Sequence, residues 1–180
     1  MKKNYMLLLV LSILCIFQQV HAQQTIDSGT GRAQNVFVEV AGQGLFFTAN
    51  YDTRFNNKRN GLGGRAGIGY LTEEGSPITT IPIGLNYLLG KGKNFFEVGL
   101  GATFIDVGRS DNDFYFPNNS DGSTGNGSTV LGTMSFSYRL QPIDSGFSIR
   151  AGLTPFFNRQ SFIPYYGGFS LGYTFSGKSK

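Results

Sequence analysis

Apolar and polar residues alternate with a period of two through most of the chain between residues 35 and 175. Within 95–104, for example, apolar residues occupy the even positions, and most odd positions carry small or polar residues. Successive side chains of a strand point to opposite faces, so this pattern predicts β-strands with one apolar and one small or polar face. No segment of useful length has the 3.6-residue period of an amphipathic helix, and the predicted fold class is therefore all-β. The alternating runs are 62–70, 78–89, 95–107, 129–141, 147–157 and 168–175.

Turn-forming residues separate the alternating runs. Most of the breaks are short and rich in Gly, Asn, Asp, Ser or Pro, which favour tight turns. One break is long: residues 108–127 are polar and rich in Gly, Asn and Ser, which predicts a surface loop. The short breaks are 56–61, 72–77, 90–93, 142–146 and 158–162.

The number of strands depends on residues 35–55. This stretch is about twice as long as the ~9–11 residues that one membrane-spanning strand needs. It contains Ala41-Gly42-Gln43-Gly44, a plausible tight turn. Splitting the stretch there gives eight strands, an even number that leaves both ends of the sheet on the same side. The alternative is one long strand with a glycine bulge at 42–44.

Two all-β architectures compete for this pattern. In a soluble sandwich the polar faces would meet water, yet here they consist mostly of Gly, Ser and Thr with isolated charges, which indicates packing. The chain has 26 Gly, 17 Phe and 9 Tyr, and its aromatic residues gather near strand ends, as in the aromatic girdles of membrane barrels. We therefore predict an antiparallel up-and-down transmembrane β-barrel of eight strands. A soluble, secreted, lipocalin-like barrel is a further alternative.

The N-terminus has the pattern of a secretory signal peptide. Two lysines precede an apolar run from Met6 to Phe17, and Val20-His21-Ala22 fits a cleavage site. The run is shorter than the ~20 residues of a membrane-spanning helix. The predicted organisation is a signal peptide at 1–22, a flexible lead-in at 23–34, a barrel domain at 35–175 with loop 108–127, and a periplasmic tail at 176–180.

The export signal, the eight alternating strands and the segment FSLGYTF near the C-terminus resemble the small outer-membrane β-barrels of Gram-negative bacteria. The similar proteins are barrels of the outer-membrane protein A and X type and small porin-like proteins of Bacteroidetes. The resemblance implies an outer-membrane location, a monomer, and two partners: the membrane lipid and the barrel assembly machinery. It also implies that the aromatic last strand is the assembly signal, although the tail 176–180 displaces it from the C-terminus. The residues that match this signal are Phe169, Leu171, Tyr173 and Phe175.

The polar faces of the strands carry seven charged residues. An eight-stranded barrel is just wide enough for its side chains to fill the interior, and buried charges need partners. We therefore expect an ion-pair network that fills the lumen and prevents ion flow. The alternative places some of these charges near the rims, in water. The seven residues are Glu39, Asp52, Glu97, Arg54, Arg65, Arg139 and Arg150.

The sequence argues against catalysis. Cleavage after Ala22 removes the only His and the only Cys, so His-dependent bases, thiol nucleophiles and His or Cys metal sites are excluded. We predict no enzyme activity, metal or cofactor, and no lysine-rich run indicates nucleic-acid binding. Two function classes stay open: a structural or surface-interaction barrel that binds an unknown extracellular ligand, and a narrow pore or small-molecule transporter. For the first, Phe114, Tyr115 and Phe116 in loop 108–127 are the candidate contacts.

Overall fold

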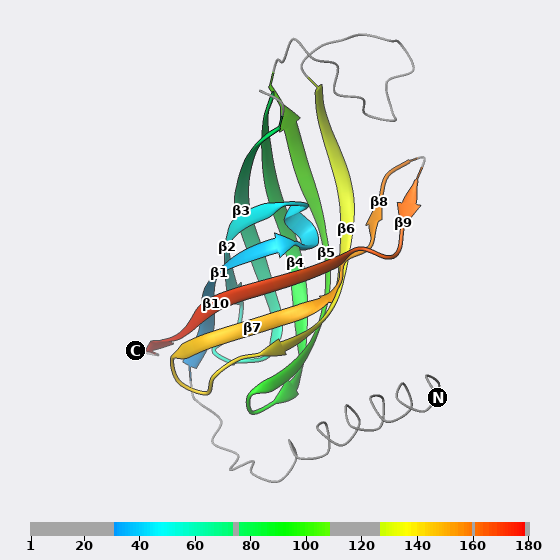
Figure 1. Ribbon diagram of the computed structural model, residues 1–180. Coiled ribbons are helices and arrows are strands. Elements are labelled where there is room, and N and C mark those ends of the chain that lie inside the picture. Colours follow the sequence, from blue (N-terminus) through cyan, green and yellow to red (C-terminus); the bar gives the residue numbers. More distant parts are fainter. Residues whose placement is uncertain (1–30, 74–75, 109–126, 160, 179–180) are drawn as a thin grey trace, which may run out of the picture.

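The computed structural model describes residues 31–73, 76–108, 127–159 and 161–178 (Figure 1). All its long elements are strands, and no helix in these ranges is long and apolar enough to cross a membrane. The elements in chain order are β1 (Gly31–Ala41), the 3-10 turn η2 (Gly42–Gly44), β2 (Phe47–Arg54), β3 (Gly61–Glu73), β4 (Ser76–Lys91), β5 (Asn94–Val107), β6 (Gly127–Leu140), β7 (Gly146–Leu153), β8 (Phe156–Phe157), β9 (Phe162–Ile163) and β10 (Gly167–Lys178).

Eight of the strands close into an antiparallel barrel. Strands β1 to β7 pair in chain order, β10 pairs with β7, and β10 also pairs with β1, which closes the sheet. The short strands β8 and β9 form a hairpin that pairs with β6 beyond the end of β7. Each barrel strand therefore has a partner on both sides, as the predicted eight-stranded barrel requires.

The wall of the barrel is uneven in height. Strands β3 to β6 contain 13 to 16 residues each, whereas β2 and β7 contain 8. The short connections 55–60, 92–93 and 141–145 lie at one end of the barrel, which we call the turn end, together with the paired residues Gly31 and Lys178. At the opposite end, the loop end, β3 to β6 rise above the shorter strands (Figure 1).

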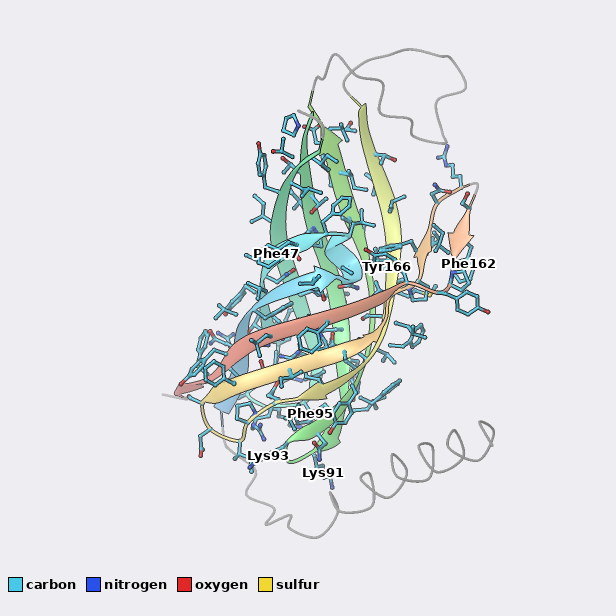
Figure 2. All side chains as sticks on the ribbon, in the orientation of Figure 1. Phe47, Lys91, Lys93, Phe95, Phe162 and Tyr166 are labelled. Carbon is cyan, nitrogen blue, oxygen red and sulfur yellow. The ribbon has the colours of Figure 1, made fainter. Side chains whose placement is uncertain are left out.

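As predicted, the apolar faces of the strands point outward and the small or polar faces point into the barrel. On β5, Phe96, Leu100 and Phe104 point outward and are exposed, while Glu97 and Thr103 point inward and are buried. The same division holds around the barrel, so the outer surface is apolar and the interior is mostly polar. Figure 2 shows the side chains on the ribbon.

The predicted split of residues 35–55 is confirmed, because β1 and β2 are separate strands joined through η2. Several predicted boundaries are wrong. Residues 31–34 of the expected flexible lead-in belong to β1, and residues 176–178 of the expected tail belong to β10, where the two segments pair with each other. The run 147–157 is not one strand, since β7 ends at Leu153 and Phe156–Phe157 form β8. Backbone pairing with a distant strand decides these positions, and it leaves no trace in the local period.

Candidate functional site in the barrel lumen

The seven charged residues of the polar faces all point into the lumen and are buried. Among the described residues, six ion pairs join them into one chain in which cations and anions alternate. In order, the contacts are Arg54–Asp52 (2.6 Å), Asp52–Arg139 (3.4 Å), Arg139–Glu97 (3.2 Å), Glu97–Arg150 (2.7 Å), Arg150–Glu39 (3.3 Å) and Glu39–Arg65 (2.7 Å). We call this set the lumen network.

Neutral partners complete the two arginine ends of the lumen network. Arg54 donates to the side-chain oxygen of Asn86 at 2.6 Å and to the Gly61 carbonyl at 2.9 Å. At the other end, Arg65 donates to the side-chain oxygen of Asn50 at 2.8 Å. Hydrogen bonds to charged groups are roughly twice as strong as neutral ones, so these amides stabilise the terminal cations.

Every strand of the barrel contributes to this layer. Strands β1, β2, β3, β5, β6 and β7 supply the charges, β4 supplies Asn86, and β10 supplies Ser170, whose hydroxyl accepts from Nε of Arg150 at 3.2 Å. The guanidinium groups of Arg65 and Arg150 also lie 5.0 and 4.4 Å from the ring centre of Phe37. The lumen network therefore ties the whole circumference of the barrel together.

Inward-facing glycines make room for these long side chains. A Cβ atom built on Gly63 would collide with the Arg54 guanidinium, and one built on Gly67 would collide with the Asn50 amide. Glycine is thus required where a neighbouring side chain lies flat on the backbone. The glycines on the polar face of β3 thus leave room for the long polar side chains of the neighbouring strand.

Arg59 closes the turn end of the lumen. It comes from the 55–60 turn, is buried, and donates to the carbonyls of Gly92 (2.7 Å), Gln141 (3.1 Å) and Pro142. Burial lowers the pKa of Arg59, and the nearby carboxylate of Asp144 opposes this effect. The three turns are therefore held together across the opening. Beneath them, three buried side chains fill the floor: Leu88, Phe95 and Gln141.

The connection between β1 and β2 folds into the lumen near the loop end. Gln43 in η2 is buried, and its carbonyl accepts a hydrogen bond from the Thr103 hydroxyl of the opposite wall. Ala41 and Leu45, on either side of η2, have φ angles of 59° and 72°, which non-glycine residues rarely adopt. The inward turn is thus held by contacts with the wall that offset its backbone strain.

A small apolar core surrounds this inward turn. Ile78 and Ile105 project into the lumen from the tall wall and pack with Leu45. From the β9–β10 connection, the Tyr166 hydroxyl donates to the Leu45 carbonyl, and burial raises the pKa of Tyr166. Val107 and Leu131 complete the core. The loop end of the lumen therefore holds an apolar core, and its contents are less polar than the predicted small and polar lining.

The remaining predicted site residues lie elsewhere. Phe169, Leu171 and Tyr173 of β10 point outward and are exposed, whereas Phe175 is half-buried near the turn end. Phe114, Tyr115 and Phe116 lie outside the described residues. None of these groups joins the lumen network among the described contacts.

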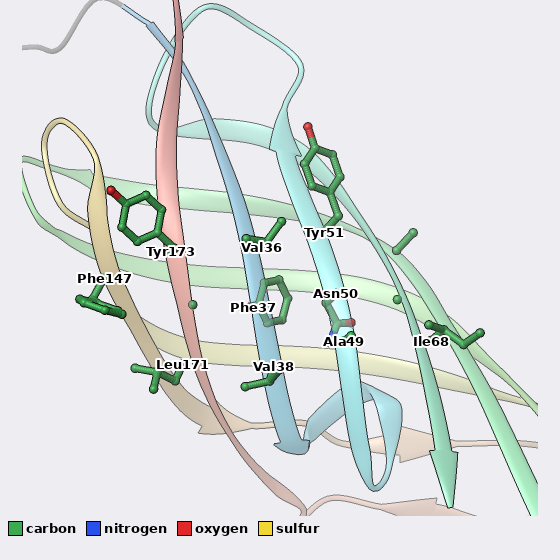
Figure 3. Close-up of a pocket in the computed structure, with 13 residues that line it drawn as sticks. Val36, Phe37, Val38, Ala49, Asn50, Tyr51, Ile68, Phe147, Leu171 and Tyr173 are labelled. Carbon is green, nitrogen blue, oxygen red and sulfur yellow. The ribbon is translucent and has the colours of Figure 1, made fainter.

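The outer wall has a shallow hollow over β10, β1, β2 and β3 (Figure 3). Val38 and Ala49 lie along its floor, between Tyr173 on one side and Tyr51 and Ile68 on the other. Most of its lining side chains belong to the outward faces of the strands, and the inward residues Phe37 and Asn50 also contribute to the lining. The hollow is thus part of the apolar outer surface.

Comparison with known proteins identifies the fold. No protein-family model and no curated protein matches the chain. Among solved structures, the N-terminal β-barrel domain of Pseudomonas aeruginosa OprF matches with a TM-score of 0.53 and 10% sequence identity, over 83% of this chain and 100% of that one. The chain has the fold of that barrel domain. This likeness fits the closed eight-stranded topology described above.

Two features of the lumen were not predicted from the sequence. Arg59 lies in a turn that the sequence marks as solvated, and its role depends on carbonyls more than thirty residues away. The inward fold of η2 also lacks a local signal, because Gly42-Gln43-Gly44 reads simply as a tight turn. The inward apolar positions Ile78, Ile105 and Val107 were the available clue, since apolar residues on a polar face need an apolar neighbour.

Proposed function

We propose that this protein is a non-enzymatic integral barrel of the outer membrane of Gram-negative bacteria, with a closed lumen and a structural or surface-interaction role. The observation that carries the proposal is the inverted distribution of polarity. Large apolar side chains cover the outside, while the seven charged residues of the lumen network are buried inside. A water-soluble barrel would expose polar residues instead, so this surface suits lipid.

The closed backbone supports the same proposal. In hydrocarbon, every backbone N–H and C=O needs an internal partner, and only helices and closed barrels meet this requirement. Strand pairing around this barrel is continuous from β1 through β10, with the β8–β9 hairpin adding pairs to β6 where β7 ends. Membrane barrels have short turns on the periplasmic side and longer loops outside. We therefore propose that the turn end faces the periplasm and the loop end faces the exterior.

The filled lumen favours a closed barrel over the alternative of a narrow pore. Three layers stand in the way of an ion: the floor at Arg59, the lumen network, and the inward turn at η2. Moving a hydrated ion through the middle layer would require the buried pairs to separate, which leaves buried charges without their partners. We therefore expect little ion conductance.

A rigid frame with a loop at its outer end suits a surface-interaction role. Strands β5 and β6, which flank loop 108–127, pair without interruption from Asn94–Leu140 to Val107–Gly127. We propose that they present Phe114, Tyr115 and Phe116 to an extracellular ligand of unknown identity. For biogenesis, we propose that the outward aromatic face of β10, ending at Phe175, is the assembly signal that the barrel assembly machinery recognises.

Two measurements test the proposal. Cell fractionation combined with heat-modifiable gel mobility tests the membrane barrel, because a folded barrel should fractionate with the outer membrane and shift in mobility when boiled. Native protein that stays in solution without detergent would overturn this part. Planar-bilayer recording tests the closed lumen, with a detergent-only sample as the control. A steady, large conductance from pure protein would show that the lumen is open and would favour the transporter alternative.

A further inference from the structure

The β8–β9 hairpin occupies a gap in the wall of the barrel. Strand β7 stops at Leu153, which pairs with Phe136 of β6, so the part of β6 nearer the loop end has no β7 partner. The hairpin supplies partners there: Phe156 pairs with Thr133, Phe157 pairs with Gly132, and the Pro155 carbonyl accepts from the Met134 N–H at 2.9 Å. It therefore replaces β7 at the loop end and stands beside the wall (Figure 1).

The two faces of the hairpin have different surroundings. Phe156 is buried on the inner face and packs against Tyr166, with ring centres 4.7 Å apart and the rings tilted by 54°. Phe157 lies on the outer face, where its ring covers Gly132, which faces outward on β6. The inner face is thus anchored to the core at the loop end, and the outer face continues the apolar outer surface of the barrel.

Strand β9 extends this outer face with an exposed aromatic residue. Phe162 pairs with Phe157, so the two side chains lie on the same face, and Phe162 is 60% exposed. Ile163 pairs with Phe156 and belongs to the opposite face. Figure 2 labels Phe162 on the hairpin, beside the barrel wall. Phe162 is thus an exposed phenylalanine beside an apolar wall, and an apolar neighbour would remove its ring from water.

We propose that the outer face of the β8–β9 hairpin lies on the outer leaflet of the membrane and inserts Phe162 at the boundary between headgroups and acyl chains. This inference rests on the membrane barrel proposed above. Continuity with the apolar wall through Phe157 and Gly132 favours lipid as the occupant, and aromatic side chains are enriched at this depth. Arg159, exposed at the tip of the hairpin, adds the positive charge that anionic headgroups attract.

The absence of tryptophan from the chain permits a direct test, because one substitution creates a protein with a single tryptophan. Phe162→Trp reports on the outer face, and Ile163→Trp is the matched variant on the opposite face of the same strand. Leu100→Trp places the reporter in the middle of the β5 outer surface, and Asn57→Trp places it in an exposed turn. Each full-length variant is folded into phosphatidylcholine–phosphatidylglycerol vesicles, some of whose acyl chains carry bromine, and is also exposed to aqueous iodide.

Loss of fluorescence to bromine measures contact with lipid, and loss to iodide measures contact with water. We expect Phe162→Trp to lose more fluorescence to bromine and less to iodide than Ile163→Trp, with a blue-shifted emission. Equal quenching of the two variants, or the reverse order, would overturn the inference and leave the hairpin facing water or a protein partner. Leu100→Trp separates this failure from that of the membrane proposal: if its fluorescence is also lost to iodide and not to bromine, the barrel itself does not span lipid.

Discussion

Glu97 is the residue whose replacement tests the lumen network most sharply. Its carboxylate is fully buried and pairs with Arg139 at 3.2 Å and Arg150 at 2.7 Å. Glu97→Gln keeps the shape of the side chain but removes its charge. The lumen network would then hold four guanidinium groups against the carboxylates of Glu39 and Asp52 alone.

The expected loss follows from the burial of these pairs. Two unit charges about 4 Å apart attract by roughly 4 kcal/mol at the effective dielectric of a protein. Breaking a buried pair by neutralising one partner typically costs about 3–5 kcal/mol, because the other charge stays buried without compensation. We therefore expect Glu97→Gln to lower the free energy of unfolding by about 3–5 kcal/mol, whereas exposed pairs contribute at most about 1 kcal/mol.

Urea unfolding of the refolded barrel in detergent micelles, followed by heat-modifiable gel mobility and circular dichroism, measures this change. Asp106→Asn is the matched control, because Asp106 is an exposed carboxylate on the same strand. A second step adds Arg150→Met to Glu97→Gln. If the buried charge causes the loss, the double variant should recover part of it. A loss below about 1 kcal/mol for Glu97→Gln would mean that water reaches the carboxylate, and it would refute the network as the filling of the lumen.

Three further changes test other parts of the molecule. Arg59→Met should lower the free energy of unfolding by about 1–3 kcal/mol, because it removes the donor that joins three turns, while Lys58→Met should stay within about 0.5 kcal/mol. Gly63→Ala should cost about 1–3 kcal/mol through its collision with Arg54, whereas Gly64→Ala, on the outer face of the same strand, should cost less, and equal losses would contradict the packing. Phe175→Ala should reduce the amount of folded barrel in the outer membrane, measured by heat-modifiable mobility, while deletion of residues 179–180 should not; the opposite result would move the assembly signal away from the last strand.

The strand period was sufficient to predict which seven charged residues of the strands point into the lumen. A barrel strand has only two faces, so the position of each charge in the alternation decides whether it points inward. Glu97 lies between outward Phe96 and Val98, and its burial follows from that register alone. The pairing partners could not be predicted in the same way, because they depend on the stagger between strands that are distant in sequence. The alternating order of the lumen network is therefore a property of the closed barrel.

The loop end was harder to predict because it departs from a uniform barrel. Alternation continues from β7 through Phe157, yet β7 ends at Leu153 and the chain leaves the barrel wall. The period-two alternation is the same for one long strand and for a short strand followed by a hairpin. Here the hairpin pairs with β6, the same strand that β7 pairs with, but at another part of it. The tail was misjudged for a related reason: Ser176 to Lys178 have no apolar face, but their backbone pairs with β1.

The uneven wall connects these unpredicted features. Because β2 and β7 are short, the tall strands would present Ile78, Ile105 and Val107 to an open space at the loop end. The inward turn fills that space with Leu45, and Tyr166 joins the turn to the segment that follows the β8–β9 hairpin. Strands β2 and β7 thus end early, and two connections cover the space that they leave. The β1–β2 connection and the β9–β10 connection pack against each other and against the tall wall. The same packing joins the β8–β9 hairpin, through the contact of Phe156 with Tyr166, to the inward turn and the tall wall, so these parts of the loop end form one continuous packed unit.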